Sequence, residues 1–186
     1  MINLNQADIV LHSIEELANK KYLPIVGPEK GSVLVDVLRE IKPKRVLEIG
    51  ALIGYSTILM AKELESEARI ITIEIDEDEA KIAEENIKKA RIKPKINVIV
   101  GDALKILPKL EGKFDFVFID AAKREYIKYL KLIEDKLHKG SLLVADNAGC
   151  FAESMKEYLE YVRSSKEYKS KFLPIGNDGL EITTKV

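Results

Sequence analysis

Two aspartates and an asparagine stand where strand-like segments end. Asp120 follows the apolar run Phe114–Ile119, and Asp146 and Asn147 follow the run 141–145. Because the carboxyl ends of neighbouring parallel strands open into one crevice, we expect the three side chains to meet there. Their oxygens are ligands that Mg²⁺ prefers, so we predict a magnesium site formed by Asp120, Asp146 and Asn147. Taken singly, each aspartate is explained at least as well as the cap of a following helix.

A lysine lies next to this candidate metal site. Lys123 follows Asp120 by three residues, within reach of a substrate hydroxyl held at the metal. A nearby divalent cation would favour the neutral, proton-accepting form of a lysine by charge repulsion, so we predict that Lys123 is a general base. A solvated lysine at a helix start is the alternative. His12 and His138 fall in a helix and at a helix end, and neither position suggests a zinc site.

A glycine turn follows the first strand-like run, Arg45–Ile49. It contains Glu48 and Gly50, and Gly54 opens the next helix. Glycines at these points let the backbone turn tightly and approach a ligand. The dinucleotide fingerprint needs three glycines, and Glu48 would repel a diphosphate but favour a cation. We therefore expect Glu48, Gly50 and Gly54 to contact a positively charged nucleotide-type cofactor such as S-adenosylmethionine; an ordinary strand-to-helix turn is the alternative.

The next two strand ends carry residues suited to an adenosine group. Glu74 stands 24 residues after Gly50, where an acid can accept hydrogen bonds from both ribose hydroxyls. After the third run comes a glycine turn with a short acid, suited to the adenine ring: Gly101, Asp102 and Ala103. By itself this turn is equally a helix cap.

Alternating strand-like and helical segments must position these residues. Apolar, β-branched runs predict five buried parallel strands at 45–49, 69–75, 96–100, 114–119 and 141–145. Spacings of three and four between apolar residues predict helices at 54–65, 76–90, 124–137 and 151–163. Two short runs, 168–173 and 180–186, flank a turn-rich segment and predict an antiparallel pair at the sheet edge.

The whole pattern predicts an α/β fold: a Rossmann-like, doubly wound, seven-stranded sheet, mostly parallel with an antiparallel edge strand, and helices on both faces. Its 186 residues suit a single domain. Residues 1–41 contain two amphipathic stretches, which we expect to form a helical cover, and residues 42–186 form the cofactor-binding core.

Charge and composition exclude several classes of protein. The sequence has 30 basic and 31 acidic residues, so its net charge of -1 offers no general attraction to nucleic acid or to an anionic membrane. Its first residues lack the pattern of a secretion signal, and no apolar run approaches the ~18 residues of a membrane span. We expect a cytoplasmic protein. Its single cysteine, Cys150, has no partner for an internal disulfide.

Taken in order, these residues resemble the class I, divalent-metal-dependent O-methyltransferases, the family of catechol and caffeoyl-coenzyme A methyltransferases. The resemblance covers about residues 24–147. Residues 24–31, Pro-Ile-Val-Gly-Pro-Glu-Lys-Gly, resemble the segment that closes over the cofactor, and residues 46–56 resemble the first cofactor motif. The resemblance implies further S-adenosylmethionine contacts by Val26, Tyr55, Ser56, Ile75 and Asp120, and assigns the base to Lys123.

The same resemblance implies a small hydroxylated acceptor, whose oxygen attacks the sulfonium methyl of S-adenosylmethionine. It also implies a homodimer. One departure concerns the acceptor. Residues 148–150, Ala-Gly-Cys, lead almost directly into the expected helix, where many relatives have an apolar insertion over an aromatic substrate. We therefore expect an open acceptor pocket, with Cys150 as a spectator beside it.

Other functions fit the same residues. Some bacterial relatives methylate a hydroxylated nucleoside in tRNA, for which Lys21, Lys30 and Lys128 would supply phosphate contacts, although balanced charge favours solvated lysines. A non-catalytic adenosine-binding module would use the cofactor residues alone. A nicotinamide oxidoreductase on the same sheet would leave the three oxygen ligands without a purpose.

Overall fold

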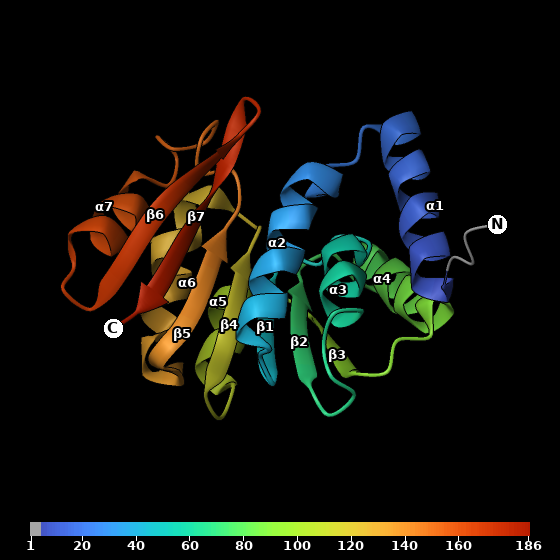
Figure 1. Ribbon diagram of the computed structural model, residues 1–186, viewed down its shortest axis with the longest axis horizontal. Coiled ribbons are helices and arrows are strands. Elements are labelled where there is room, and N and C mark those ends of the chain that lie inside the picture. Colours follow the sequence, from blue (N-terminus) through green and yellow to red (C-terminus); the bar gives the residue numbers. More distant parts are fainter. Residues whose placement is uncertain (1–4) are drawn as a thin grey trace.

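The computed structural model describes residues 5–186; residues 1–4, part of the start that lacks a secretion-signal pattern, lie outside the described residues. Its centre is a seven-stranded sheet of order β3-β2-β1-β4-β5-β7-β6 (Figure 1). Strands β1 to β5 are parallel, and β7 runs antiparallel to both β5 and β6. The predicted α/β fold is confirmed. The strands are β1 Arg45–Ile49, β2 Arg69–Glu74, β3 Lys95–Val100, β4 Phe114–Ile119, β5 Leu137–Ala145, β6 Tyr168–Ile175 and β7 Asp178–Lys185.

Helices cover both faces of the sheet (Figure 1). One layer contains α1 Gln6–Lys21, α2 Gly27–Ile41, α3 Tyr55–Ala61 and α4 Glu77–Ala90. The other contains α5 Ala103–Ile106, α6 Tyr126–Ile133 and α7 Lys156–Ser164. Among the described helices, none is long and apolar enough to cross a membrane.

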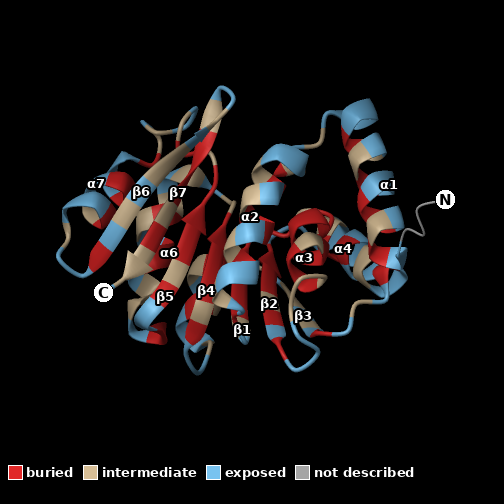
Figure 2. Cartoon of the chain, in the orientation of Figure 1, coloured by how far each residue is buried: buried red, intermediate tan, exposed pale blue. Residues whose placement is uncertain are grey.

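The alternation of side chains along each strand builds two cores. Val46 in β1 belongs to the same core as Leu34 of α2 and Ile58 of α3, whereas the next residue, Leu47, belongs to the opposite core with Tyr126 of α6. Both faces of the central strands are therefore buried, and the exposed residues of the helices lie on their outer sides (Figure 2).

Several boundaries, and the burial of one strand, differ from the predictions. Helix α7 begins at Lys156, not near 151, because the backbone after Asn147 is held in turns by hydrogen bonds to Asp178. Strand β5 begins at Leu137, so His138 lies in a strand and not at a helix end; its Nε2 lies 2.9 Å from Oδ1 of Asp115. Strand β3 is only partly buried, because it forms the sheet edge.

Candidate active site

A cavity of about 520 Å³ opens at the carboxyl ends of the parallel strands, a size typical of small-molecule sites. Residues at the ends of β1 and β2, and residues directly after β3, β4 and β5, line its wall, together with the segment that leads into α2. The cavity brings together most of the residues expected from the sequence: Val26, Gly50, Tyr55, Ser56, Glu74, Ile75, Gly101, Asp102, Ala103, Asp120, Lys123, Asp146 and Asn147.

Glu48 does not line the cavity, contrary to our expectation. It shares the face of β1 that packs against α3, and it is completely buried. Its Oε2 accepts hydrogen bonds from Thr57 and, at 2.6 Å, from Thr72. No described residue donates to the buried Oε1. Burial, opposed by these hydrogen bonds, raises the pKa of Glu48 to about 7, so this carboxyl is a core residue beneath the glycine turn.

The two glycines of the turn have different roles. Gly50 has φ +97°, and a Cβ there would lie 2.2 Å from the carbonyl oxygen of Asp120, so only glycine lets the turn lie against the end of β4. Gly54 does not line the cavity, which corrects our expectation. With φ +85°, it lets α3 approach Ala83 of α4, 3.2 Å from where a Cβ would lie.

Glu74 reaches the cavity and also braces its wall. Its Oε2 accepts hydrogen bonds from the backbone nitrogens of Ala51 at 3.1 Å and Leu52 at 2.7 Å. Its Oε1 accepts from those of Ile75 at 2.8 Å and Asp76 at 3.0 Å. A carboxylate has about four acceptor positions, and Glu74 uses them for these four backbone hydrogen bonds. The bonds tie the glycine turn to the end of β2. The ribose contact of Glu74 stays a prediction.

The expected adenine turn lies directly beside the end of β2, where the Gly101 nitrogen donates to the Glu74 carbonyl, and its residues line the cavity. Asp102 lines it and also caps α5, because its Oδ1 accepts a hydrogen bond from the Leu104 nitrogen at 2.9 Å. Glu125 and Tyr129 line the same cavity, and Tyr129 Oη donates to Glu125 Oε2 at 2.7 Å. Neither residue was predicted as a site residue, because both lie near the start of α6 and not at a strand end.

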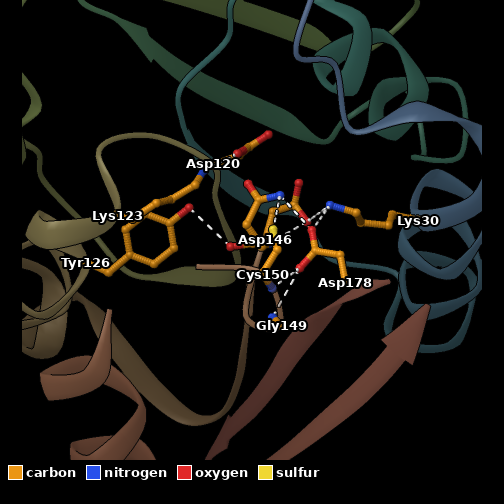
Figure 3. Close-up of polar contacts among 9 residues, drawn as sticks. Lys30, Asp120, Lys123, Tyr126, Asp146, Gly149, Cys150 and Asp178 are labelled. Atoms are coloured by element: carbon orange, nitrogen blue, oxygen red, sulfur yellow. Dashed lines mark hydrogen bonds and ion pairs between the residues drawn. The ribbon is translucent and has the colours of Figure 1, made fainter. Parts of the chain in front are cut away.

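The candidate metal ligands occupy neighbouring strand ends (Figure 3). Lys123 Nζ donates to Asp120 Oδ1 at 2.8 Å. Asp146 is only 2% exposed, and its Oδ1 accepts from the Asn147 nitrogen at 2.7 Å and from Lys30 Nζ at 2.5 Å. Burial, and then the charge of Asp120, raise the pKa of Asp146 to about 6. The two carboxylates therefore repel each other across the cavity.

This set of donors fits a divalent cation. It combines two mutually repelling carboxylates with an amide oxygen, all hard ligands suited to Mg²⁺ with retained waters. Within residues 5–186 no hydrogen bond reaches Oδ2 of Asp146, so that oxygen is free to bind a cation. The described residues bring no three His, Cys, Asp or Glu side chains together, so the set depends on Asn147.

Two further residues, Lys30 and Asp178, contact the candidate metal ligands, and neither was predicted as a site residue. Lys30 of α2 contacts Asp146 and, at 2.8 Å, Oδ2 of Asp178. Although burial opposes it, these hydrogen bonds raise the pKa of Lys30. Lys30 is therefore engaged by two carboxylates inside the protein; its phosphate contact with a tRNA substrate stays a prediction. In the sequence, Asp178 is marked by its place as the one acidic residue of the turn-rich segment 176–179.

The segment after Asn147 borders the cavity without a long insertion. Phe151 lines the cavity and is 48% exposed. Cys150 is exposed, but partial loss of water around its thiol, followed by the nearby Asp178 carboxylate, raises the pKa of the thiol. A raised pKa favours the protonated, unreactive thiol.

Comparisons with known proteins agree with this geometry. The profile of a family described as O-methyltransferase matches residues 4–167. Catechol O-methyltransferase B of Danio rerio is 39% identical over 169 residues, which cover 84% of this chain and 63% of the relative. The chain thus spans less than two thirds of that relative's length.

Two solved structures have the same fold over almost their whole length. A putative O-methyltransferase from Klebsiella pneumoniae has a TM-score of 0.86 and 28% identity, over 95% of this chain and 89% of that one. The O-methyltransferase from Bacillus cereus in complex with SAH has a TM-score of 0.87 and 26% identity, over 96% and 91%. With a cavity at the strand ends, a glycine turn and a family match over most of its residues, the chain belongs to the class I S-adenosylmethionine-dependent O-methyltransferase family.

Proposed function

We propose that the protein is an S-adenosylmethionine-dependent O-methyltransferase that methylates a hydroxyl of a small aromatic acceptor with the help of Mg²⁺. One observation carries this proposal: Asp120, Asp146, Asn147 and Lys123 line the same cavity as the residues of the glycine and adenine turns. When bound, the cofactor supplies the methyl group and Mg²⁺ supplies positive charge that makes an acceptor hydroxyl easier to deprotonate.

The chain's own residues perform two tasks. The first is to hold both reactants in attack geometry, which removes much of the entropic barrier. Gly50 and Glu74 shape the donor side of the cavity, and Phe151 offers an aromatic face beside Asn147. The exposed ring of Phe151 supports an aromatic acceptor. The name of the Danio rerio relative, a catechol O-methyltransferase, also supports it.

The second task is proton transfer. Lys123 has its Nζ at the cavity wall, next to Asp120, where its neutral form can accept the proton of an acceptor hydroxyl. Asp120, Asp146 and Asn147 are the residues that would hold the cation.

Methyl transfer to a panel that contains catechol, with Mg²⁺ or with a chelator, tests this function. We expect turnover that requires the cation, and an Asp120→Ala variant that is inactive in both conditions. Full activity of Asp120→Ala after chelation would refute the metal-dependent mechanism. Tight cofactor binding without turnover on any hydroxylated acceptor would instead support a binding module.

Lys123→Met tests the base, with Lys128→Met as the matched control because Lys128 is an exposed lysine of α6. Loss of a general base lowers kcat about 100-fold or more. We expect this fall for Lys123→Met with little change in KM, and wild-type rates for Lys128→Met. Equal rates for the two variants would exclude Lys123 as the base.

A further inference from the structure

Asp178, the first residue of β7, does not line the cavity but organises the chain next to it (Figure 3). Its Oδ1 accepts hydrogen bonds from the backbone nitrogens of Gly149 at 3.1 Å and Cys150 at 2.9 Å. Its Oδ2 accepts from Asn147 Nδ2 at 2.7 Å. One carboxylate thus fixes both the side chain of Asn147 and the turn that follows it.

These contacts determine which atom of Asn147 is available to a cation. With the amide nitrogen bound to Asp178, the amide oxygen is the atom left for the cavity that Asn147 lines. Asn147 also has φ +62°, a left-handed conformation that is uncommon outside glycine. Asparagine tolerates this conformation better than most residues, and the bonds from the turn to Asp178 help to hold it.

Asp178 acts on Asp146 through Lys30. The ammonium group of Lys30 lies 2.8 Å from Asp178 Oδ2 and 2.5 Å from Asp146 Oδ1. The side chain of Lys30 is only 15% exposed, so water screens these ion pairs weakly. Lys30 thereby fixes one oxygen of Asp146 and leaves Oδ2 for a cation.

We propose that Asp178 is a positioning residue for the cation site: it orients the amide of Asn147 directly and the carboxylate of Asp146 through Lys30. The proposal rests on the magnesium site of the proposed function. Partners that orient metal ligands in this way typically change metal affinity by about 10- to 100-fold when they are lost.

Titration of the chelator-treated full chain with Mn²⁺, followed by electron paramagnetic resonance, tests the proposal. Asp178→Asn keeps the size of the side chain and one oxygen for Gly149 and Cys150, but places an amide NH₂ against donors from Asn147 and Lys30. Asp115→Asn is the matched control, because Asp115 also accepts two backbone hydrogen bonds and contacts His138, at the end of β4 away from Asp120.

We expect Asp178→Asn to weaken Mn²⁺ binding at least about 10-fold, with the affinity for S-adenosylmethionine changed by less than about threefold. Asp115→Asn should bind Mn²⁺ like the wild type. Equal Mn²⁺ affinity of wild type and Asp178→Asn would overturn the proposal. If Asp178→Asn does not fold, Asp178→Glu tests the same point, because its longer arm displaces the carboxylate from Asn147 and Lys30; unchanged Mn²⁺ affinity of that variant would overturn the proposal as well.

Different binding results would exclude the magnesium site and the role of Asp178. A wild-type chain that binds S-adenosylmethionine but no Mn²⁺ would remove the magnesium site, and this proposal with it. A wild-type chain that binds both, with an Asp178 variant that binds both equally well, would remove only the role of Asp178.

Discussion

Glu48 is a completely buried carboxyl beneath the glycine turn, and its unusual protonation gives a direct test of the fold around it. Burial raises its pKa from the ordinary 4.5 to about 7. Between these two values the unfolded chain loses the proton and the folded chain keeps it, so stability falls as the pH rises. At about 1.4 kcal/mol for each pH unit, the total loss is about 3 kcal/mol, most of it between pH 5 and pH 8.

Glu48→Gln removes this titration while it keeps the shape of the side chain. Urea unfolding of cofactor-free, chelator-treated protein from pH 5 to pH 8 gives the free energy of unfolding at each pH. We expect the wild type to lose about 2–3 kcal/mol relative to Glu48→Gln over this range. The exposed Glu65 provides the control: Glu65→Gln should follow the wild-type curve.

The slope of this difference with pH is the decisive quantity. An amide at Glu48 also meets Thr57 and Thr72, which shifts the stability of Glu48→Gln by a constant amount at every pH. A difference that stays constant from pH 5 to pH 8 would therefore refute the reasoning, because Glu48 would then be ionised in the fold throughout.

Three other substitutions have defined outcomes. Gly50→Ala should abolish S-adenosylmethionine binding in calorimetry and cost about 2 kcal/mol or more in urea unfolding, because its Cβ meets the Asp120 carbonyl; unchanged binding would contradict this. The carbonyl of Lys139, and then Asp115, raise the pKa of His138. The free energy of unfolding of His138→Gln should therefore be ~0.5 kcal/mol below that of the wild type at pH 6 and equal to it at pH 9. Equal losses at both pH values would disprove the pairing. Phe151→Ala should raise the KM for an aromatic acceptor about 2- to 10-fold at unchanged kcat, and an unaltered KM would exclude stacking.

The sequence predicted the sheet and the positions of its strand ends, because buried parallel strands have a strong apolar signature. Asp120, Asp146 and Asn147 accordingly lie together. The direction of a side chain at a strand end is harder to predict: Glu48 lies two residues before Gly50, but the alternation of β1 turns it toward α3.

Contacts between distant segments were not predictable from local pattern. Lys30 and Asp178 are 148 positions apart, and each alone is typical of a solvated helix or of a turn. Gly54 was assigned to a ligand because glycine permits close approach, yet its neighbour is Ala83 of another helix. The glycine indicated that another group lies close to the backbone, and only the packing of α3 on α4 showed that this group is Ala83.

The place of Asp178 at the start of β7 also bears on the order of folding. Strand β7 inserts between β5 and β6, so β5 gains its second neighbour only after both later strands have been synthesised. Contacts of such large sequence separation form late, because the closure of long loops precedes them. In chains that are still emerging from the ribosome, Asn147 would therefore lack the support of Asp178. Cation binding could then report on completion of the fold.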